Sequence, residues 1–214
     1  MAEFQWYWSL FMALNIVNIN AKASILNCLQ ELERIEGIID LLGGTSNPVP
    51  FLTRYSIIKA CGTIEYSFKT IISDHRYTEH SEQVQRFIDE KFRNSSMNPN
   101  YNNICKALNS FDEEWCKKFK EKINNDADKT RLQDSLKSLN TARNDFAHGK
   151  SPTTSFKNVY DYFIDCIVIM EMMEASILEL EMQSAATFAP TETEGVEVSQ
   201  PGFIEIPHAA AANA

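Results

Sequence analysis

Residues Leu132 to Lys150, LQDSLKSLNTARNDFAHGK, combine the apolar pattern of a helix with a charge in an unusual place. Leu132, Leu136 and Leu139 recur at the spacing of one helix face. Arg143 follows Leu139 by four residues and falls on that same face. We therefore expect its guanidinium group to point towards protein rather than water. A buried cation is unfavourable unless an anion meets it, so the pattern predicts a carboxylate or a phosphate beside Arg143.

A histidine and a glycine mark the end of this helix, which we place at residues 126–146. His148 lies five residues after Arg143. Gly149 suits the left-handed C′ position, and Pro152 prevents the helix from continuing. Taken alone, these residues also fit a histidine whose side chain caps the last carbonyl groups of the helix.

Apolar residues at steps of three and four predict helices in most of the remaining chain. We expect them at residues 21–42, 52–73, 79–92, 101–124 (one or two helices) and 156–182. No strand-rich segment and no glycine-rich phosphate loop occurs. The fold class is therefore all-α, an antiparallel helical bundle of about five to six helices with a flexible C-terminal tail. The 156–182 helix is apolar nearly all round, so we expect it to be central, or to be covered by the domain and a partner together.

The chain divides into three segments. Residues 20–183 form the helical domain, and residues 184–214 form an acidic, disordered tail rich in Pro, Thr, Glu and Ala. Residues 1–19 form an apolar arm in which polar residues interrupt the apolar ones and no basic residue comes first, unlike a secretory signal or a membrane span. We expect the arm to pack on the domain or on a partner subunit, with a membrane anchor as the alternative.

The acidic charge of the chain is concentrated at one end. The formal net charge is −9, yet residues 161–214 hold 10 acidic residues and no Lys or Arg. Residues 115–160 hold ten basic residues against five acidic ones, among them Lys137 and Lys150 beside the Arg143 segment. This balance predicts a locally basic surface that suits a nucleic acid, with ordinary solvated helix faces as the alternative.

The five cysteines lie at long spacings without a C-x-x-C pair, as expected of small core residues in the reducing cytoplasm. His75 and His80 are spaced so that they fall on different helix faces, and no cysteine lies near them. We therefore expect no metal site and no cofactor.

Arg143, Asn144 and His148, within RNDFAHG, form an R-x4-H motif with an asparagine directly after the arginine. This motif at a helix end resembles the active-site motif of the HEPN superfamily, and the order of helices over residues 20–182 looks most like its RiboL-PSP-type branch. The resemblance implies a metal-independent endoribonuclease, often a toxin or phage-defence effector, that acts as a homodimer with both motifs facing one cleft. It implies RNA as substrate and an antitoxin protein as a further partner. A non-catalytic HEPN-like module that binds nucleotides or proteins is the alternative.

The chemistry of the motif is consistent with RNA cleavage, because RNA supplies its own nucleophile in the 2′-OH group. His148 can act as general base or acid, and Arg143 can hold phosphate oxygens bidentately. Asn144 can orient the phosphate or the histidine, or it is an ordinary surface residue.

Four further residues are candidates for supporting roles. Glu65 lies at the edge of the inward face of the 52–73 helix and is the best candidate for the carboxylate that Arg143 needs; alternatively it lies at the solvent boundary. Asp145 is the second supporting acid. Lys137 and Lys150 are candidates for binding the RNA substrate.

Overall fold

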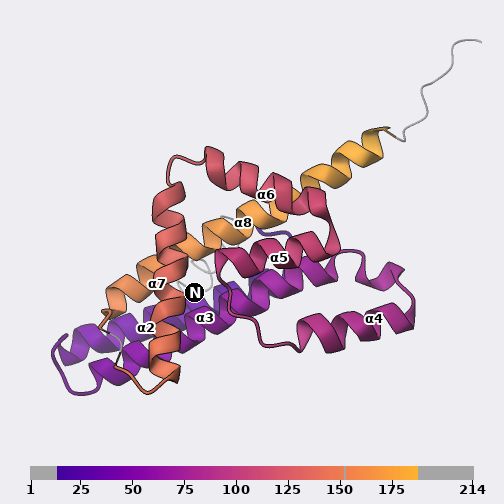
Figure 1. Cartoon of the computed structure of the whole chain (residues 1–214). Helices are drawn as coiled ribbons and strands as arrows, with labels where there is room; N and C mark the ends of the chain where they lie inside the picture. Colours follow the sequence, from indigo (N-terminus) through magenta and orange to yellow (C-terminus); the bar gives the residue numbers. More distant parts are fainter. Residues whose placement is uncertain (1–13, 152, 188–214) are drawn as a thin grey trace, which may run out of the picture.

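The computed structural model describes residues 14–151 and 153–187, which contain seven α-helices and no strand (Figure 1). The elements are α2 (Ile19–Leu42), α3 (Val49–Asp74), the 3-10 turn η1 (Tyr77–Glu79), α4 (Glu82–Ile88), the π-helical turn η2 (Asp89–Arg93), α5 (Tyr101–Phe111), α6 (Glu113–Asn125), α7 (Lys129–Ala147) and α8 (Phe156–Thr187). The predicted all-α fold is confirmed. There are seven helices rather than five or six because the helical segment after Tyr101 is interrupted at Asp112. The backbone of Asp112 is extended, and its side-chain carboxylate caps α6 by accepting a hydrogen bond from the Glu114 N–H (2.7 Å).

Helix α8 is the central element of the bundle. It packs against α3, α6 and α7, and its inward side chains between Phe156 and Ile177 are buried. Of its large apolar side chains that the structure describes, only Ile164 and Met182 are exposed. The expected central position is confirmed, and one chain covers this helix without help from a partner. Helix α8 also runs to Thr187, past the predicted start of the tail, and residues 188–214 lie outside the described part.

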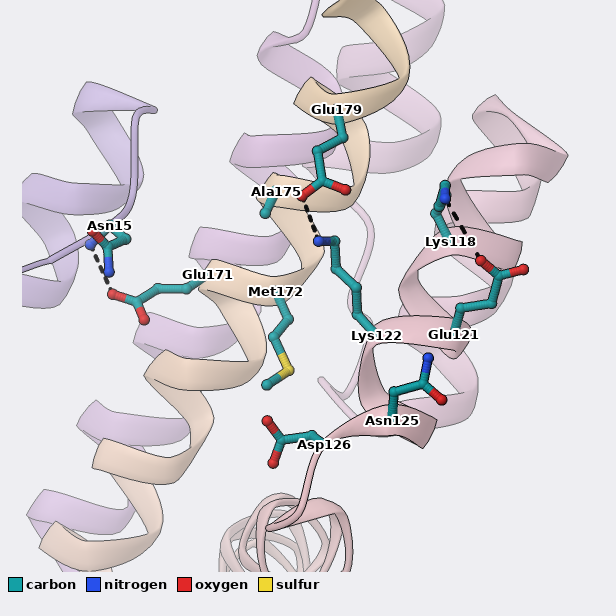
Figure 2. A pocket seen from close by; sticks show the side chains of 10 residues that line it. All are labelled: Asn15, Lys118, Glu121, Lys122, Asn125, Asp126, Glu171, Met172, Ala175 and Glu179. Atoms are coloured by element: carbon teal, nitrogen blue, oxygen red, sulfur yellow. Dashed lines mark hydrogen bonds and ion pairs between the residues drawn. The ribbon is translucent and has the colours of Figure 1, made fainter. Parts of the chain in front are cut away.

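An extended segment before α2, residues 14–18, packs along α8. Two of its apolar side chains are buried. The backbone N–H of Asn15 donates to Glu171 (2.8 Å; Figure 2), and Glu174 accepts from two further N–H groups of the segment (2.6 and 2.7 Å). Burial raises the pKa of Glu174 although these hydrogen bonds favour its charged form. This part of the arm therefore belongs to the core, whereas residues 1–13 lie outside the described part.

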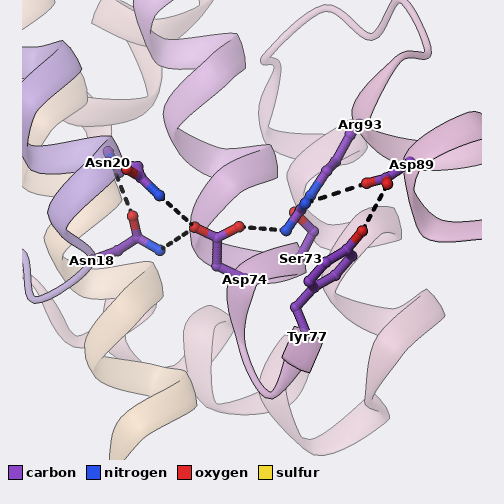
Figure 3. Close-up of polar contacts among 8 residues, drawn as sticks. Asn18, Asn20, Ser73, Asp74, Tyr77, Asp89 and Arg93 are labelled. Atoms are coloured by element: carbon purple, nitrogen blue, oxygen red, sulfur yellow. Dashed lines mark hydrogen bonds and ion pairs between the residues drawn. The ribbon is translucent and has the colours of Figure 1, made fainter. Parts of the chain in front are cut away.

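A polar network fastens the segment that carries α4 to the bundle (Figure 3). Arg93 pairs with Asp74 at the end of α3 and with Asp89 (3.2 Å), and its guanidinium group lies 3.9 Å from the centre of the Tyr77 ring. Asp74 also accepts hydrogen bonds from two asparagines at the start of α2 (3.1 and 3.2 Å). Three segments that are far apart in sequence are thereby joined at one end of α3.

The cysteines lie in the core, as their spacing suggested, and His75 directly follows α3. All five cysteines are free and buried. His75 contacts Glu181 (3.0 Å) and the edge of Trp115, and burial lowers its pKa. Within residues 14–151 and 153–187, no three His, Cys, Asp or Glu side chains are grouped so that they could hold a metal ion. None of the helices in this part of the chain is long and apolar enough to cross a membrane.

Replacing Asp165 with alanine should destabilise the protein by about 1–3 kcal/mol. This carboxylate is buried on α8, pairs with Arg131 and accepts from the Ser135 hydroxyl (2.6 Å), so its removal leaves a buried hydroxyl without an acceptor. The matched control is Asp161→Ala on the same helix, because Asp161 forms an exposed pair with Lys157. Urea unfolding would contradict the prediction if both variants had the same free energy of unfolding.

Candidate active site

Helix α7 ends in a backbone motif that presents His148 at the surface. The N–H of Gly149 bonds to the carbonyl of Phe146 (3.0 Å), and the N–H of Lys150 bonds to that of Asp145 (2.8 Å). Gly149 has a φ of 77°, which places it in the left-handed region as predicted. These bonds are the pair expected of a Schellman cap, with His148 as the C-cap residue that follows Ala147.

Arg143 is half-buried and is held by neutral amides. Its Nη1 donates to Oδ1 of Asn98 (2.9 Å) and to Oδ1 of Asn144 (3.2 Å). Asn98 in turn donates from its Nδ2 to Oδ1 of Asn144 (3.3 Å), which closes a triangle of side chains. The Nε and Nη2 groups of Arg143 have no hydrogen-bond partner among the described residues. The position of Nη1 is therefore fixed, and the edge formed by Nε and Nη2 keeps its N–H donors available for a ligand.

The expected ion pair between Arg143 and Glu65 is not formed. Glu65 instead pairs with Lys69 one turn later on α3 (2.9 Å) and accepts from the backbone N–H of Met97 (2.9 Å). The other ionisable neighbour, Cys61, is a neutral thiol, because burial raises its pKa to about 12 although the charge of Arg143 lowers it. The positive charge of Arg143 thus has no counter-charge in direct contact within the described part of the chain.

Residues 94–100, hereafter loop 94–100, bring Asn98 to α7. The loop is fixed to α3 by Lys69, whose Nζ bonds to the carbonyl of Ser95, and by Glu65 at Met97. It is fixed to α7 by Asn140, whose Nδ2 donates to the carbonyl of Pro99 (3.0 Å). These contacts therefore fix the position of loop 94–100 relative to both α3 and α7.

The His148 side chain is exposed and makes no hydrogen bond to the described residues. The carbonyls of Asn144, Asp145 and Phe146 already accept backbone N–H groups, so these three do not need the imidazole as a cap. No contact joins His148 to Arg143, and five residues correspond to about 140° around a helix axis. Within one chain, the two side chains therefore leave α7 in different directions.

Asp145, Lys150 and Lys137 lie away from Arg143. Asp145 pairs with Lys150 (3.2 Å). Lys137 and Asp145 line one surface pocket of about 430 Å³, whereas Arg143 is two residues before Asp145 and thus about 160° away around the helix. The structure brings Arg143 and Asn144 together. It groups Asp145, Lys150 and Lys137 on another side of α7.

A family model described as RiboL-PSP-HEPN matches residues 20–179 of the chain. The chain belongs to the RiboL-PSP-HEPN family. The HEPN match begins in α2 and ends within α8, so it contains loop 94–100 and the whole of α7. No curated protein and no solved structure matches the chain.

Three polar residues of this HEPN domain that hold the motif helix or the turn after it were missed in the sequence. Asn98 lies among turn-forming residues, and no pattern there indicates a contact with α7. Asn140 lies four residues after Leu136 on the buried face of α7, so a polar residue at an apolar position could have singled it out. Arg54 was also missed; it links the start of α3 to the motif turn through a bond to Ser151 (3.2 Å).

Replacing Gly149 with alanine should lower the free energy of unfolding by about 1–2 kcal/mol, because alanine resists a positive φ. Gly37→Ala is the control. Gly37 is exposed inside α2 with open space around it, so alanine there should stabilise by roughly 0.5–1 kcal/mol. Chemical denaturation of both variants measures the contrast, and a Gly149→Ala protein as stable as the wild type would show that the left-handed cap does not form.

Proposed function

We propose that this HEPN domain is a metal-independent endoribonuclease that uses Arg143 to hold the scissile phosphate. The observation that carries the proposal is the half-buried guanidinium group held by neutral amides and without a counter-charge. A cation in such a position favours an anion, and a phosphate matches the two donors, Nε and Nη2, that remain. A nucleotide phosphate is the anion that an RNA substrate brings.

The reaction needs little else from the protein. The 2′-OH group of the RNA attacks the adjacent phosphorus, and the 5′-oxygen of the next nucleotide leaves, which gives a 2′,3′-cyclic phosphate. His148, which is exposed and has no hydrogen-bond partner in the described part of the chain, transfers a proton to or from one of these oxygens. Arg143 stabilises the charge that develops on the phosphate, and Asn144 keeps the guanidinium group in place.

We also propose that the active unit is a homodimer, with an interface that differs from the one first expected. Helix α8 is covered within the chain, but the outer face of α3 is not. Phe51, Tyr55, Ile58 and Tyr66 on this face are 41–67% exposed, and Gly62 lies between them. These five residues, hereafter the α3 stripe, recur at helical spacing and form an apolar surface of the kind that marks interfaces.

The α3 stripe borders the Arg143 site. Along α3, Ile58 lies between Arg54 and Cys61. Arg54 bonds to Ser151 in the motif turn. The thiol of Cys61 bonds to Asn140 on α7 (3.8 Å), and its pKa is raised by burial and lowered in part by the charge of Arg143. A two-fold axis through the stripe would bring the two motifs to one cleft. Because Arg143 and His148 of one chain diverge, a second chain offers a second histidine to the same phosphate. A toxin or phage-defence role, with an antitoxin that covers this cleft, accords with such an activity.

Arg143→Ala and His148→Ala should each reduce RNA cleavage by roughly a hundredfold or more while the protein stays folded. The assay uses purified protein and total RNA or tRNA with EDTA present, and the expected product end is a 2′,3′-cyclic phosphate or its opened form. Lys117→Ala is the control, because it removes an exposed cation that lies on α6 rather than on α7. RNA that is bound but not cleaved would favour the adaptor function, and cleavage by both folded variants at the wild-type rate would refute the proposed mechanism.

Light scattering should report twice the 24.4 kDa mass of the chain. Ile58→Asp should raise the dimer dissociation constant on the order of a hundredfold, because each dimer would bury two carboxylates in an apolar contact, and activity should fall with it. Phe87→Asp on α4, which replaces another exposed apolar residue, should leave the dimer intact. A wild-type monomer that cleaves RNA at nanomolar concentration would show that one motif suffices.

A further inference from the structure

We infer that Asn98 is a positioning residue for Arg143: its amide holds one edge of the guanidinium group so that the other edge can bind a phosphate. The inference rests on the proposed function and adds a residue that is 45 positions from the arginine and outside the R-x4-H motif. It also explains why the chain has an asparagine, rather than an acid, at the point where Arg143 meets the neighbouring loop.

The contacts of Asn98 fix the orientation of its amide. Its oxygen accepts from Nη1 of Arg143 (2.9 Å), and its nitrogen donates to the side-chain oxygen of Asn144 (3.3 Å). A reversed amide would place N–H groups against the guanidinium donors and an oxygen against an oxygen, so one orientation satisfies both contacts. Arg143 therefore meets two acceptors on Nη1 alone, and its rotation about the end of the side chain is restricted.

The loop that carries Asn98 is itself held in place. Lys69 binds the carbonyl of Ser95, Glu65 binds the N–H of Met97, and Asn140 binds the carbonyl of Pro99. Lys69 is buried, and its ion pair with Glu65 joins the first two of these contacts. Glu65 thus acts on Arg143 through the loop, by placing Asn98, and not as a counter-charge.

A neutral amide at position 98 leaves the charge of Arg143 available. A carboxylate there would accept the same hydrogen bond as an ion pair, and the neutralised guanidinium group would attract a phosphate less. Asn98→Asp therefore separates two roles. Aspartate keeps the contact with Arg143 but loses the hydrogen bond that Asn98 donates to Asn144 (3.3 Å), so a small loss of stability is expected in either case. If Asn98 only held the loop, aspartate would leave phosphate binding near the wild-type level; if Asn98 positions a cation for phosphate, aspartate would weaken phosphate binding without unfolding the protein.

The experiment compares Asn98→Asp, Asn98→Ala and the control Asn103→Ala in the full chain. The control removes a hydrogen bond to the backbone carbonyl of Asn98 (2.9 Å) but spares its side chain. Each variant is assayed for kcat and KM on RNA and for thermal unfolding. Inorganic phosphate is titrated while the Nε–H signal of Arg143 is followed by NMR.

We expect Asn98→Asp to stay folded and to unfold within a few degrees of the wild type. It should lose kcat/KM by about tenfold or more, chiefly through KM, and it should lose the phosphate-dependent shift of the Arg143 signal. Asn98→Ala should lose kcat, because the guanidinium group is no longer oriented, and Asn103→Ala should resemble the wild type. If Asn98→Asp cleaved RNA and responded to phosphate like the wild type, the inference would be overturned. If the Arg143 signal of the wild-type protein shifts with phosphate but the protein does not cleave RNA, the proposed nuclease activity would be refuted and the positioning role of Asn98 would stand.

Discussion

The arrangement of the candidate site depends on one unfavourable interaction, the half-buried positive charge of Arg143, which meets no negative partner within residues 14–151 and 153–187. Proteins commonly resolve such a charge with a carboxylate, and Glu65 lies close enough that both it and Arg143 act on the Cys61 thiol. The chain instead directs Glu65 to Lys69 and surrounds Arg143 with amides and a neutral thiol. The remaining attraction for an anion is what a phosphate-binding site requires, so the local cost in stability at Arg143 accords with the proposed function.

Helix positions were largely predictable because they follow from local periodicity. The pattern around Leu132, Leu136 and Leu139 placed α7 to within a few residues, and the glycine at 149 marked its end. The all-round apolar composition of residues 156–182 also predicted a central helix. These features depend on neighbours within a few turns, which a single sequence displays directly.

The contacts of the site were not predictable in the same way. Glu65 pairs with Lys69, which is one turn away on the same helix, and the apolar pattern does not express this preference. Asn98 is 45 residues from Arg143, in a loop with no periodicity. The α3 stripe was visible in the sequence, since residues 51, 55, 58, 62 and 66 share a helix face. The prediction of a helix rested on the apolar residues of the inward face of α3, and this second face was not considered.

The central position of α8 has a consequence for the order of assembly. It follows every other described helix in the sequence, yet α3, α6 and α7 all pack on it. During synthesis the preceding helices emerge with their apolar faces uncovered, and the core closes only when α8 is made. Helix α7 packs against both α8 and α3, so a nascent or truncated chain that lacks α8 leaves part of the buried face of the motif helix uncovered. The proposed site would in this way reach its final surroundings only after the last described helix is made.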